Sequence, residues 1–439
     1  MSKVDVLLGL QFGDEGKGKL VDFLSPNYNI IARFSGGSNA GHSIYFNGEK
    51  HVLHLIPSGI FRDNCISVIG SGVVIDPIDL KKEILEVEEY GINVRSKLYI
   101  SKKATLTLPT HKYLDKFQEI EKGTSKIGST LKGIGPTYTD KVSRQSIRVY
   151  DIFSDNFQKK VGLLKMKHLE IITKNQQPFA AGYTQTLNEV IGKEWTHVLA
   201  DKEEEWYEAV EFLKEYNIIN TENFLNNSLK EGKSILAEGA QGTHLDIDHG
   251  TYPFVTSSST TISGVISGLG IPPQSIGNVF GVFKSYLTRV GSGPMLTEIE
   301  GEFGEEFRKL GNEFGATTGR PRRCAWLDLP SLKYSIMING VTELHMMKLD
   351  ILSNFDSIKV CVGYKMGDQV LTEYDPDLID RSEPIYQEFE GWKTEITECQ
   401  SFENLPPKAI VYINFIENWL GVPIKKVSVG PDRSKTIEK

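Results

Sequence analysis

The chain has 439 residues, of which 39% are hydrophobic and 24% are charged, a composition typical of a globular protein. Its 21 Phe, 17 Tyr and 5 Trp residues provide material for hydrophobic cores, which excludes a globally disordered chain. The 57 acidic residues outnumber the 49 basic ones, and the resulting net charge of −8 argues against a general nucleic-acid-binding protein.

The four cysteines, Cys65, Cys324, Cys361 and Cys399, lack the C-x-x-C spacing of a zinc knuckle or a redox pair. We therefore expect reduced thiols that are mostly buried. The N-terminal segment enters a strand pattern at Val4–Leu8 and lacks the basic and long apolar regions of a signal peptide. Because no apolar run approaches the ~20 residues that span a bilayer, we expect a cytoplasmic protein without a membrane partner.

Short, continuously apolar runs recur along the chain, which is typical of strands buried on both faces of a parallel sheet. These runs lie at Val4–Leu8, Ile30–Ala32, Val73–Ile75, Ile235–Ala237, Val279–Phe283, Leu344–Met347 and Ile358–Val362. Helices are predicted over Lys19–Leu24, Asp79–Tyr90, Glu203–Tyr216 and Lys408–Leu420. The pattern predicts an α/β fold with a large, mostly parallel central sheet flanked by helices. We expect one domain over residues 1–439, with helical insertions that form a mainly helical excursion at about 105–230.

A glycine-rich segment, Gly9–Leu20, follows the first predicted strand and opens a helix. Within it, a Gly-x4-Gly-Lys run from Gly13 to Lys19 has the spacing of a phosphate-binding P-loop, in which backbone N–H groups and the Lys bind phosphate oxygens. Leu20 stands where nucleoside triphosphatases have a magnesium-binding Ser or Thr. Asp14 is an alternative oxygen ligand, although a carboxylate among phosphates is repulsive unless a metal or a substrate proton offsets it. The competing interpretation is a structural glycine-rich turn.

Two further polar loops follow predicted strands, where α/β sheets bind ligands. Ser35–Ser43 is rich in glycine and contains His42, for which we favour a catalytic or ligand-binding role over a structural one. The neutral side chains of Glu238–Thr243 and Asp246–Ser258 suit an uncharged ring and a phosphate, or else a hydrogen-bonded surface turn. The other histidines are interpreted as structural: His51, His54, His111, His168, His197, His244, His249 and His345.

Two segments in the second half of the chain carry charge at informative positions. Gly315–Arg323 has three arginines in four residues after Thr-Thr-Gly, which indicates an anion-binding loop, with a solvated basic turn as the alternative. Met347–Asp350 ends an apolar strand. There, Asp350 can accept hydrogen bonds from N1–H and the 2-amino group of guanine, while the stem of Lys348 packs over the base. Beside a phosphate loop, this tetrapeptide favours GTP over ATP.

Taken together, these segments closely resemble the adenylosuccinate synthetase family, in order and over nearly the full chain. Phe12 stands where the family commonly has Trp. The matching motifs are Gln11–Lys19, Asn39–His42, Gly133–Pro136, Gln241–Thr243, Asp246–Pro253, Gly315–Arg320 and Gly430–Arg433. The resemblance implies a GTP-dependent ligase that joins IMP and L-aspartate through 6-phosphoryl-IMP, giving adenylosuccinate, GDP and phosphate. This reaction is the committed step from IMP to AMP in purine biosynthesis.

The resemblance also implies roles for individual residues. Asp14 is the base on N1 of IMP and, with the carbonyl of Gly41, a ligand of one Mg²⁺ per subunit. His42 is the acid that stabilises charge at O6, and Lys17 and Gln241 complete the catalytic set. Positions that match IMP-binding residues are Asp14, Glu15, Gly16, Lys17, Asn39, Ala40, Gly41, His42, Thr130, Arg144, Gln241, Thr256 and Arg320.

GTP and aspartate binding carry over in the same way. Positions that match GTP-binding residues are Gly13, Asp14, Glu15, Gly16, Lys17, Gly18, Lys19, Gly41, His42, Ser43, Arg322, Lys348, Leu349, Asp350, Ser428, Val429 and Gly430. Positions that match aspartate-binding residues are Ala316, Thr317, Thr318, Gly319, Arg320, Pro321 and Arg322. The resemblance further implies a homodimer in which Arg144 reaches the IMP phosphate of the partner subunit.

The chain departs from the family pattern at a few positions. Leu131 and Lys132 stand where the family commonly has Gly and Arg, and Leu is less flexible than Gly in such a loop. Pro321 interrupts an arginine run and is expected to stiffen the aspartate loop. Two other classes of protein stay open on the residues alone: a regulatory GTPase switch and a nucleotide-binding structural protein. A ligase releases phosphate from GTP only when IMP and aspartate are both present, whereas a switch needs neither.

Overall fold

The computed structural model describes residues 3–46, 49–174, 195–315, 319–376 and 379–439. The apolar runs assemble into a ten-stranded central sheet in which all neighbouring strands are parallel except β19 and β20. From one edge to the other, the strands are β20 (Thr436–Glu438), β19 (Ile424–Ser428), β15 (Glu343–Met347), β11 (Ile276–Lys284), β1 (Val4–Gly9), β10 (Ile235–Glu238), β2 (Ile30–Arg33), β5 (Ile66–Ile69), β7 (Leu98–Ser101) and β9 (Asn217–Ile219). The predicted fold class is confirmed.

Two predicted strands lie outside this sheet. Ile358–Val362 falls within β16 (Ser357–Met366), which pairs antiparallel with β17 (Gln369–Leu371) and β18 (Glu383–Glu390) and parallel with β14 (Leu327–Asp328). A turn at Gly367, with φ of 61°, folds the chain back on β16, so its partner comes from the adjacent segment.

The second exception is Val73–Ile75. Its last two residues form β6 (Val74–Ile75), which pairs only with β8 (Thr105–Leu106) among the described strands. The central-sheet strand of this region is β5, whose apolar run the buried Ser67 interrupts.

The four predicted helices are present with shifted ends, as α1 (Lys17–Leu24), α2 (Pro77–Glu88), α8 (Trp195–Leu213) and α13 (Pro407–Leu420). The helix α2 starts early because the Asp76 side chain accepts a hydrogen bond from the N–H of Ile78, at 2.9 Å, and Pro77 occupies the first turn. The excursion predicted at about 105–230 contains α4 (Pro109–Glu121), α5 (Ile134–Val142), α6 (Phe157–Lys174), α8 and α9 (Thr221–Lys230), and also the sheet strand β9.

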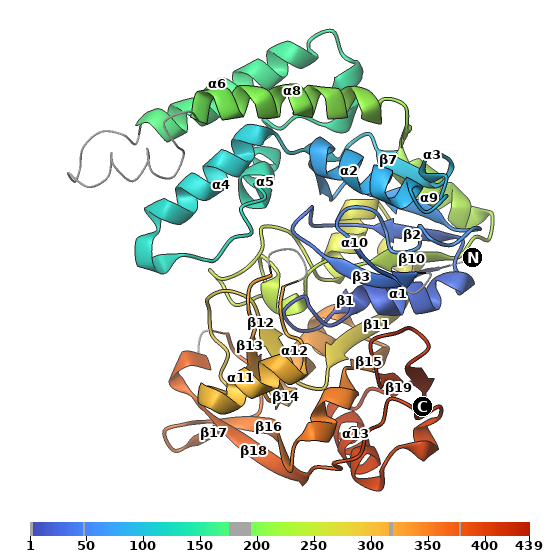
Figure 1. Cartoon of the computed structure of the whole chain (residues 1–439), viewed down its shortest axis with the longest axis vertical. Helices are drawn as coiled ribbons and strands as arrows, with labels where there is room; N and C mark the ends of the chain where they lie inside the picture. The colour runs from blue at the N-terminus through green and yellow to red at the C-terminus, as the bar shows by residue number, and fades with distance from the viewer. Residues whose placement is uncertain (1–2, 47–48, 175–194, 316–318, 377–378) are drawn as a thin grey trace.

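The central sheet lies between two different layers along the long axis of the molecule. In Figure 1, α4, α5, α6 and α8 form a helical layer at one end, and the small sheet of β16–β18 lies with α13 at the other. Trp206 of α8 is buried, and its indole N–H donates to the carbonyl of Thr107 at 2.9 Å, which ties the helical layer to the chain below it. The assignment of all residues to a single domain stays a prediction.

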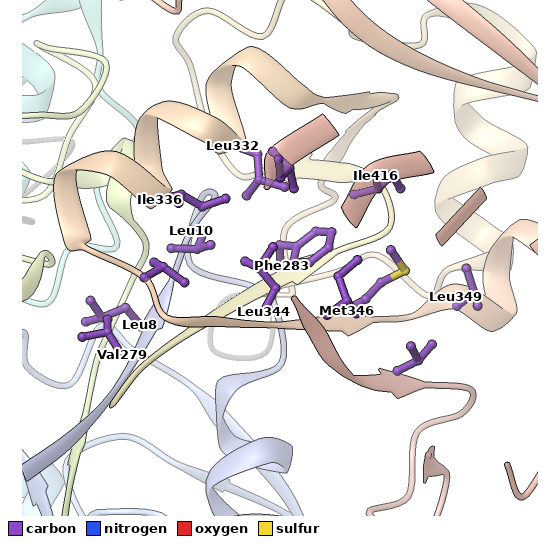
Figure 2. Close-up of a cluster of buried hydrophobic side chains, with 14 of the residues drawn as sticks. Leu8, Leu10, Val279, Phe283, Leu332, Ile336, Leu344, Met346, Leu349 and Ile416 are labelled. Atoms are coloured by element: carbon purple, nitrogen blue, oxygen red, sulfur yellow. The ribbon is translucent and has the colours of Figure 1, made fainter. Parts of the chain in front are cut away.

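The largest core forms where one face of the sheet meets α12 (Leu329–Asn339) and α13. Figure 2 shows side chains from β1 and the residue that follows it, from β11 and β15, and from both helices: Leu8, Leu10, Val279, Phe283, Leu344, Met346, Leu332, Ile336 and Ile416. None of the described helices is long and apolar enough to cross a membrane.

Parallel pairing has a direct consequence for the site. The strands β15, β11, β1, β10 and β2 are neighbours in the sheet, so their carboxyl ends lie along one edge. The predicted motifs that follow these strands are therefore brought to the same edge of the sheet. Open α/β sheets bind ligands at this edge.

Candidate active site

A cavity of about 390 Å³ opens at this edge of the sheet. Its walls come from the phosphate loop, the Asn39–His42 loop, the end of α4 with the chain that follows it, the segment between Gln241 and Ser257, the chain around Arg289, and the arginine loop. Predicted site residues that line it are Gly13, Asp14, Asn39, Ala40, Gly41, His42, Thr130, Gln241, Thr256, Arg320 and Arg322. Five separate segments that carry predicted site residues thus line one cavity.

Other predicted site residues do not line the cavity. These are Glu15, Gly16, Lys17, Gly18, Lys19, Ser43, Arg144, Gly319, Pro321, Lys348, Leu349, Asp350, Ser428, Val429 and Gly430. The predicted aspartate-binding residues Ala316, Thr317 and Thr318 lie outside the described residues.

The phosphate loop is held from within by two of its own side chains. The Oε1 of Glu15 accepts hydrogen bonds from the N–H groups of Gln11, at 3.0 Å, and Gly13, at 2.8 Å. Its Oε2 pairs with the Nζ of Lys17 at 2.7 Å, and both side chains are almost fully buried. Gly13 has a φ of 95°, and a Cβ there would come 2.9 Å from the Cα of Gln241. Only glycine permits this approach of the two loops.

The lysine at the P-loop position points away from the cavity. The Nζ of Lys19 donates to Ser428 Oγ at 2.6 Å and to the carbonyl of Gly430 at 2.7 Å. Burial lowers the pKa of Lys19 to about 8, although Asp350 and Asp432 oppose the shift. Lys19 therefore joins α1 to the Ser428–Gly430 segment, which is predicted to bind GTP.

Asp14 contacts Arg322, a predicted site residue, and two residues that were not predicted, Lys284 and Thr288. Its Oδ2 lies 3.1 Å from Nε of Arg322 and accepts from the hydroxyl of Thr288, and its Oδ1 lies 3.3 Å from Nζ of Lys284. Lys284 ends β11 and is fully buried, so it follows a strand like the predicted motifs, but without a glycine-rich context. The repulsion expected between this carboxylate and phosphates is thus already reduced by two cations of this chain.

His42 is oriented by a second carboxylate that the sequence analysis left without a role. The Nδ1 of His42 lies 2.5 Å from Oε1 of Glu238, which has no exposed surface, and Ser58 donates to the same carboxylate. Burial lowers the pKa of His42, while the Glu238 hydrogen bond opposes this. The His42 Nε2 has no hydrogen-bond partner among the described residues, so this nitrogen is available to a ligand in the cavity. Glu238 ends β10, and its strand-end position was a usable signal.

The loop around Thr130 is anchored to α4 by two acidic side chains. Asp115 accepts from Ser129 Oγ at 2.7 Å and from the N–H of Gly133 at 2.9 Å, and Glu119 accepts from the N–H of Ser129 at 3.1 Å. Leu131 adopts a left-handed φ of 58°, a conformation that glycine takes without strain. Its side chain is 43% exposed, so the cost is backbone strain of about 1–2 kcal/mol.

Two more loops meet across the cavity. The amide Nε2 of Gln241 donates to Asn39 Oδ1 at 3.2 Å, and Arg320 Nη1 donates to the carbonyl of Gly128 at 2.8 Å. The second contact connects the arginine loop to the chain that precedes Thr130. The predicted IMP and aspartate segments are therefore in direct contact.

The predicted guanine site lies beside the cavity. Burial raises the pKa of Asp350, and its Oδ1 is buried without a hydrogen-bond partner in the described part of the chain. Lys348 has a left-handed φ of 59°, and its Nζ donates to the carbonyl of Gly311 at 2.7 Å. A buried acceptor without a donor is what a guanine edge would satisfy.

His111 and His168 form a buried cluster with Asp140 that joins α4, α5 and α6. His111 Nδ1 accepts from the N–H of Leu108 at 2.8 Å, so its Nε2 carries the proton that it donates to Asp140. No lone pair is then left on this Nε2 for a metal, which supports the structural interpretation of both histidines. The side chain of His197 lies outside the described residues.

The phosphate loop lies between a strand and a helix at the carboxyl edge of a parallel sheet, and Asp350 offers a buried acceptor that suits a purine base. Together these features define a nucleotide-dependent α/β enzyme. The family model for adenylosuccinate synthetase matches residues 6–437. The chain belongs to the adenylosuccinate synthetase family, and its reaction is the GTP-dependent joining of IMP and aspartate to form adenylosuccinate in AMP biosynthesis.

The similarity extends over whole chains. The adenylosuccinate synthetase of Parabacteroides distasonis is 52% identical over 435 residues, covering 99% of this chain and 98% of the relative. That of Bacteroides thetaiotaomicron is 51% identical over 437 residues, covering 100% and 99%. The structure of a fully ligated adenylosuccinate synthetase from Plasmodium falciparum superposes with a TM-score of 0.90 at 39% identity and covers both chains fully. These relatives favour the ligase over the GTPase switch.

The His42–Glu238 pair makes a testable prediction. Glu238→Gln replaces the charged partner of the imidazole by a neutral amide, and loss of a charge-assisted hydrogen bond costs about 1.5–3 kcal/mol. We expect kcat to fall roughly 10–150-fold, with little change in the KM for aspartate, in steady-state assays. Ser58→Ala keeps the carboxylate and serves as the matched control. Equal kcat values in the wild type and Glu238→Gln would contradict the role.

Proposed function

We propose that Asp14 is the general base and His42 the acid of this ligase. Asp14 takes the proton from N1 of IMP, and the O6 oxyanion then attacks the γ-phosphate of GTP to give 6-phosphoryl-IMP and GDP. The observation that supports this is that Asp14 and His42, from two different loops, both line the cavity, and that His42 Nε2 has no hydrogen-bond partner among the described residues. His42 Nε2 stabilises the charge that develops at O6 and on the transferring phosphoryl group.

In the second step, the amine of aspartate displaces phosphate from C6. We assign the aspartate carboxylates to the arginine loop, with Arg320 also near IMP and Arg322 near GTP. Both guanidinium groups line the cavity, and guanidinium forks bind carboxylates in a bidentate manner. Asn39, Thr130, Gln241 and Thr256 line the same cavity and are assigned to IMP. Glu15 and Lys17 support the loop from within, and their predicted contacts with IMP and GTP stay proposals.

We further propose one Mg²⁺ site per subunit, formed by Asp14 and the carbonyl of Gly41. The fit rests on donor chemistry: the Asp14 carboxylate and Gly41 both line the cavity, and carboxylate and carbonyl oxygens are the ligands that Mg²⁺ prefers. When bound, the ion would neutralise phosphate charge during transfer. Lys284 and Arg322 supply positive charge to the same carboxylate from within the chain.

A cytoplasmic location is also proposed. It is supported by the four free cysteines, which suit a reducing compartment.

The Asp14 assignment predicts the effect of one isosteric change. Asp14→Asn removes the base while keeping the shape of the loop, so kcat should fall by at least about 10²-fold. The measurement is phosphate release from GTP, which in the wild type should require both IMP and aspartate. Thermal unfolding and IMP binding serve as controls for the fold. A variant with more than about a tenth of wild-type kcat would refute the assignment.

The guanine assignment predicts a change in nucleotide preference. Asp350→Asn replaces an acceptor by an amide that can donate, which opposes guanine N1–H and tolerates the 2-carbonyl of xanthine. The ratio of kcat/KM for GTP over XTP should fall by more than about tenfold. Asp356→Asn is the matched control, because Asp356 is an exposed carboxylate nearby that pairs with Lys393. If the ratio does not move in Asp350→Asn, the guanine pocket lies elsewhere.

We propose that the active enzyme is a homodimer in which Arg144 crosses to the partner's IMP phosphate. Arg144 follows α5, is exposed, has a left-handed φ of 64° and does not line the cavity of its own chain. Exposed apolar side chains occur next to it and on nearby elements, as is common at protein interfaces: Val142, Tyr150, Phe153, Leu163 and Met166.

The shared site predicts complementation between two inactive variants. In a mixed dimer of Asp14→Asn and Arg144→Leu chains, one site carries both defects and the other carries neither. Random exchange at equal concentrations makes about half of the dimers mixed, so roughly a quarter of wild-type activity should appear on mixing. A tagged pull-down confirms that mixed dimers formed. If they form and activity stays at the level of the separate variants, Arg144 does not act across the interface.

A further inference from the structure

A buried carboxylate outside the cavity contacts cations from three parts of the site. Glu313 has no exposed surface. Its Oε1 accepts from Lys348 Nζ at 2.7 Å and from the hydroxyl of Tyr286, and its Oε2 accepts from Arg322 Nη1 at 2.5 Å. The Nζ of Lys284 lies 3.2 Å from both oxygens. These five residues are called the Glu313 cluster below.

The cluster is continuous with the proposed catalytic base. Lys284 and Arg322 contact both Glu313 and Asp14, so two carboxylates and two cations alternate in a closed arrangement. Lys348 is a third cation, paired with Glu313. Buried charges are strongly unfavourable unless they are paired. When one cation moves, the electrostatic attraction between Glu313 and the other two cations therefore changes.

Glu313 also holds the base of the arginine loop through its backbone. Its carbonyl accepts from the N–H of Arg322 at 2.9 Å, and within the loop the N–H of Gly315 donates to the carbonyl of Arg320 at 2.8 Å. Lys348 leads directly into Asp350, the proposed guanine acceptor. One side chain thus connects the end of the guanine segment to the end of the aspartate segment.

We propose that Glu313 is a positioning residue that couples guanine-nucleotide binding at Lys348 to aspartate binding at Arg322. The inference rests on the proposed roles of Lys348 and Arg322. Both cations bind the carboxylate of Glu313. When a ligand attracts one of these cations, the attraction between Glu313 and the other cation becomes stronger. Coupling between two binding sites is reciprocal, so aspartate must change nucleotide affinity by the same factor that nucleotide changes aspartate affinity.

The test compares GDP affinity with and without saturating L-aspartate, by calorimetry in the presence of IMP. GDP replaces GTP so that no turnover occurs. In the wild-type enzyme we expect aspartate to change the Kd of GDP by about 5–150-fold, and in Glu313→Gln this ratio should fall toward one. Glu298→Gln is the matched control. Glu298 pairs with Arg323 at the base of the same loop but makes no contact with the Glu313 cluster among the described interactions, and the ratio should be retained.

A ratio of one in the wild type, or the wild-type ratio in folded Glu313→Gln, overturns the proposal. If Glu313→Gln does not fold, Glu313→Asp replaces it, because it keeps the charge on a side chain one methylene group shorter and so lengthens the contacts with Arg322 and Lys348. Lys348→Met must weaken GDP binding and Arg322→Leu must raise the KM for aspartate. If either variant lacks its expected effect, the proposed roles of Lys348 and Arg322 are refuted. If both variants behave as expected but Glu313→Gln keeps the wild-type Kd ratio, only the coupling is refuted.

Discussion

The site depends on the charge balance around Asp14. A carboxylate inside a phosphate-binding loop is unfavourable unless positive charge lies close by, and here Lys284 and Arg322 supply it from β11 and the arginine loop. Both cations are shared with Glu313, so they stay paired when no substrate is present. Loss of one partner from such a buried set costs about 3–5 kcal/mol. The balance therefore holds together loops that are far apart in the chain.

The same balance requires very close packing of the loops. Gly13 meets the backbone of Gln241, and a Cβ on Gly18 would come 2.9 Å from the Cβ of His42. These glycines let α1 and the phosphate loop approach the two loops that follow β2 and β10. Because five neighbouring strands are parallel, their carboxyl ends bring all of these loops to one edge. Functional side chains from segments that are distant in the sequence therefore line a single cavity.

The helical layer extends this arrangement beyond the sheet. α4 anchors the Thr130 loop through Asp115 and Glu119, and the buried Asp140 cluster ties α4 to α5 and α6. Arg144 follows α5, so the cluster also fixes the direction in which this exposed arginine leaves the layer. The same helices thus form part of the cavity wall in their own chain and place the Arg144 side chain on the surface of the protein.

The sequence by itself determined the local features: the apolar runs of the sheet, the glycine-rich phosphate loop, the arginine loop and the family. These follow from short-range patterns, since strand burial and tight turns depend on residues close together in the chain. Only the tertiary structure decided that Ile358–Val362 joins a separate, mostly antiparallel sheet, because strand pairing depends on which surfaces meet. It also decided that Lys284 and Glu238 serve Asp14 and His42. Those contacts span 270 and 196 residues, and no local pattern encodes charge pairing over such separations.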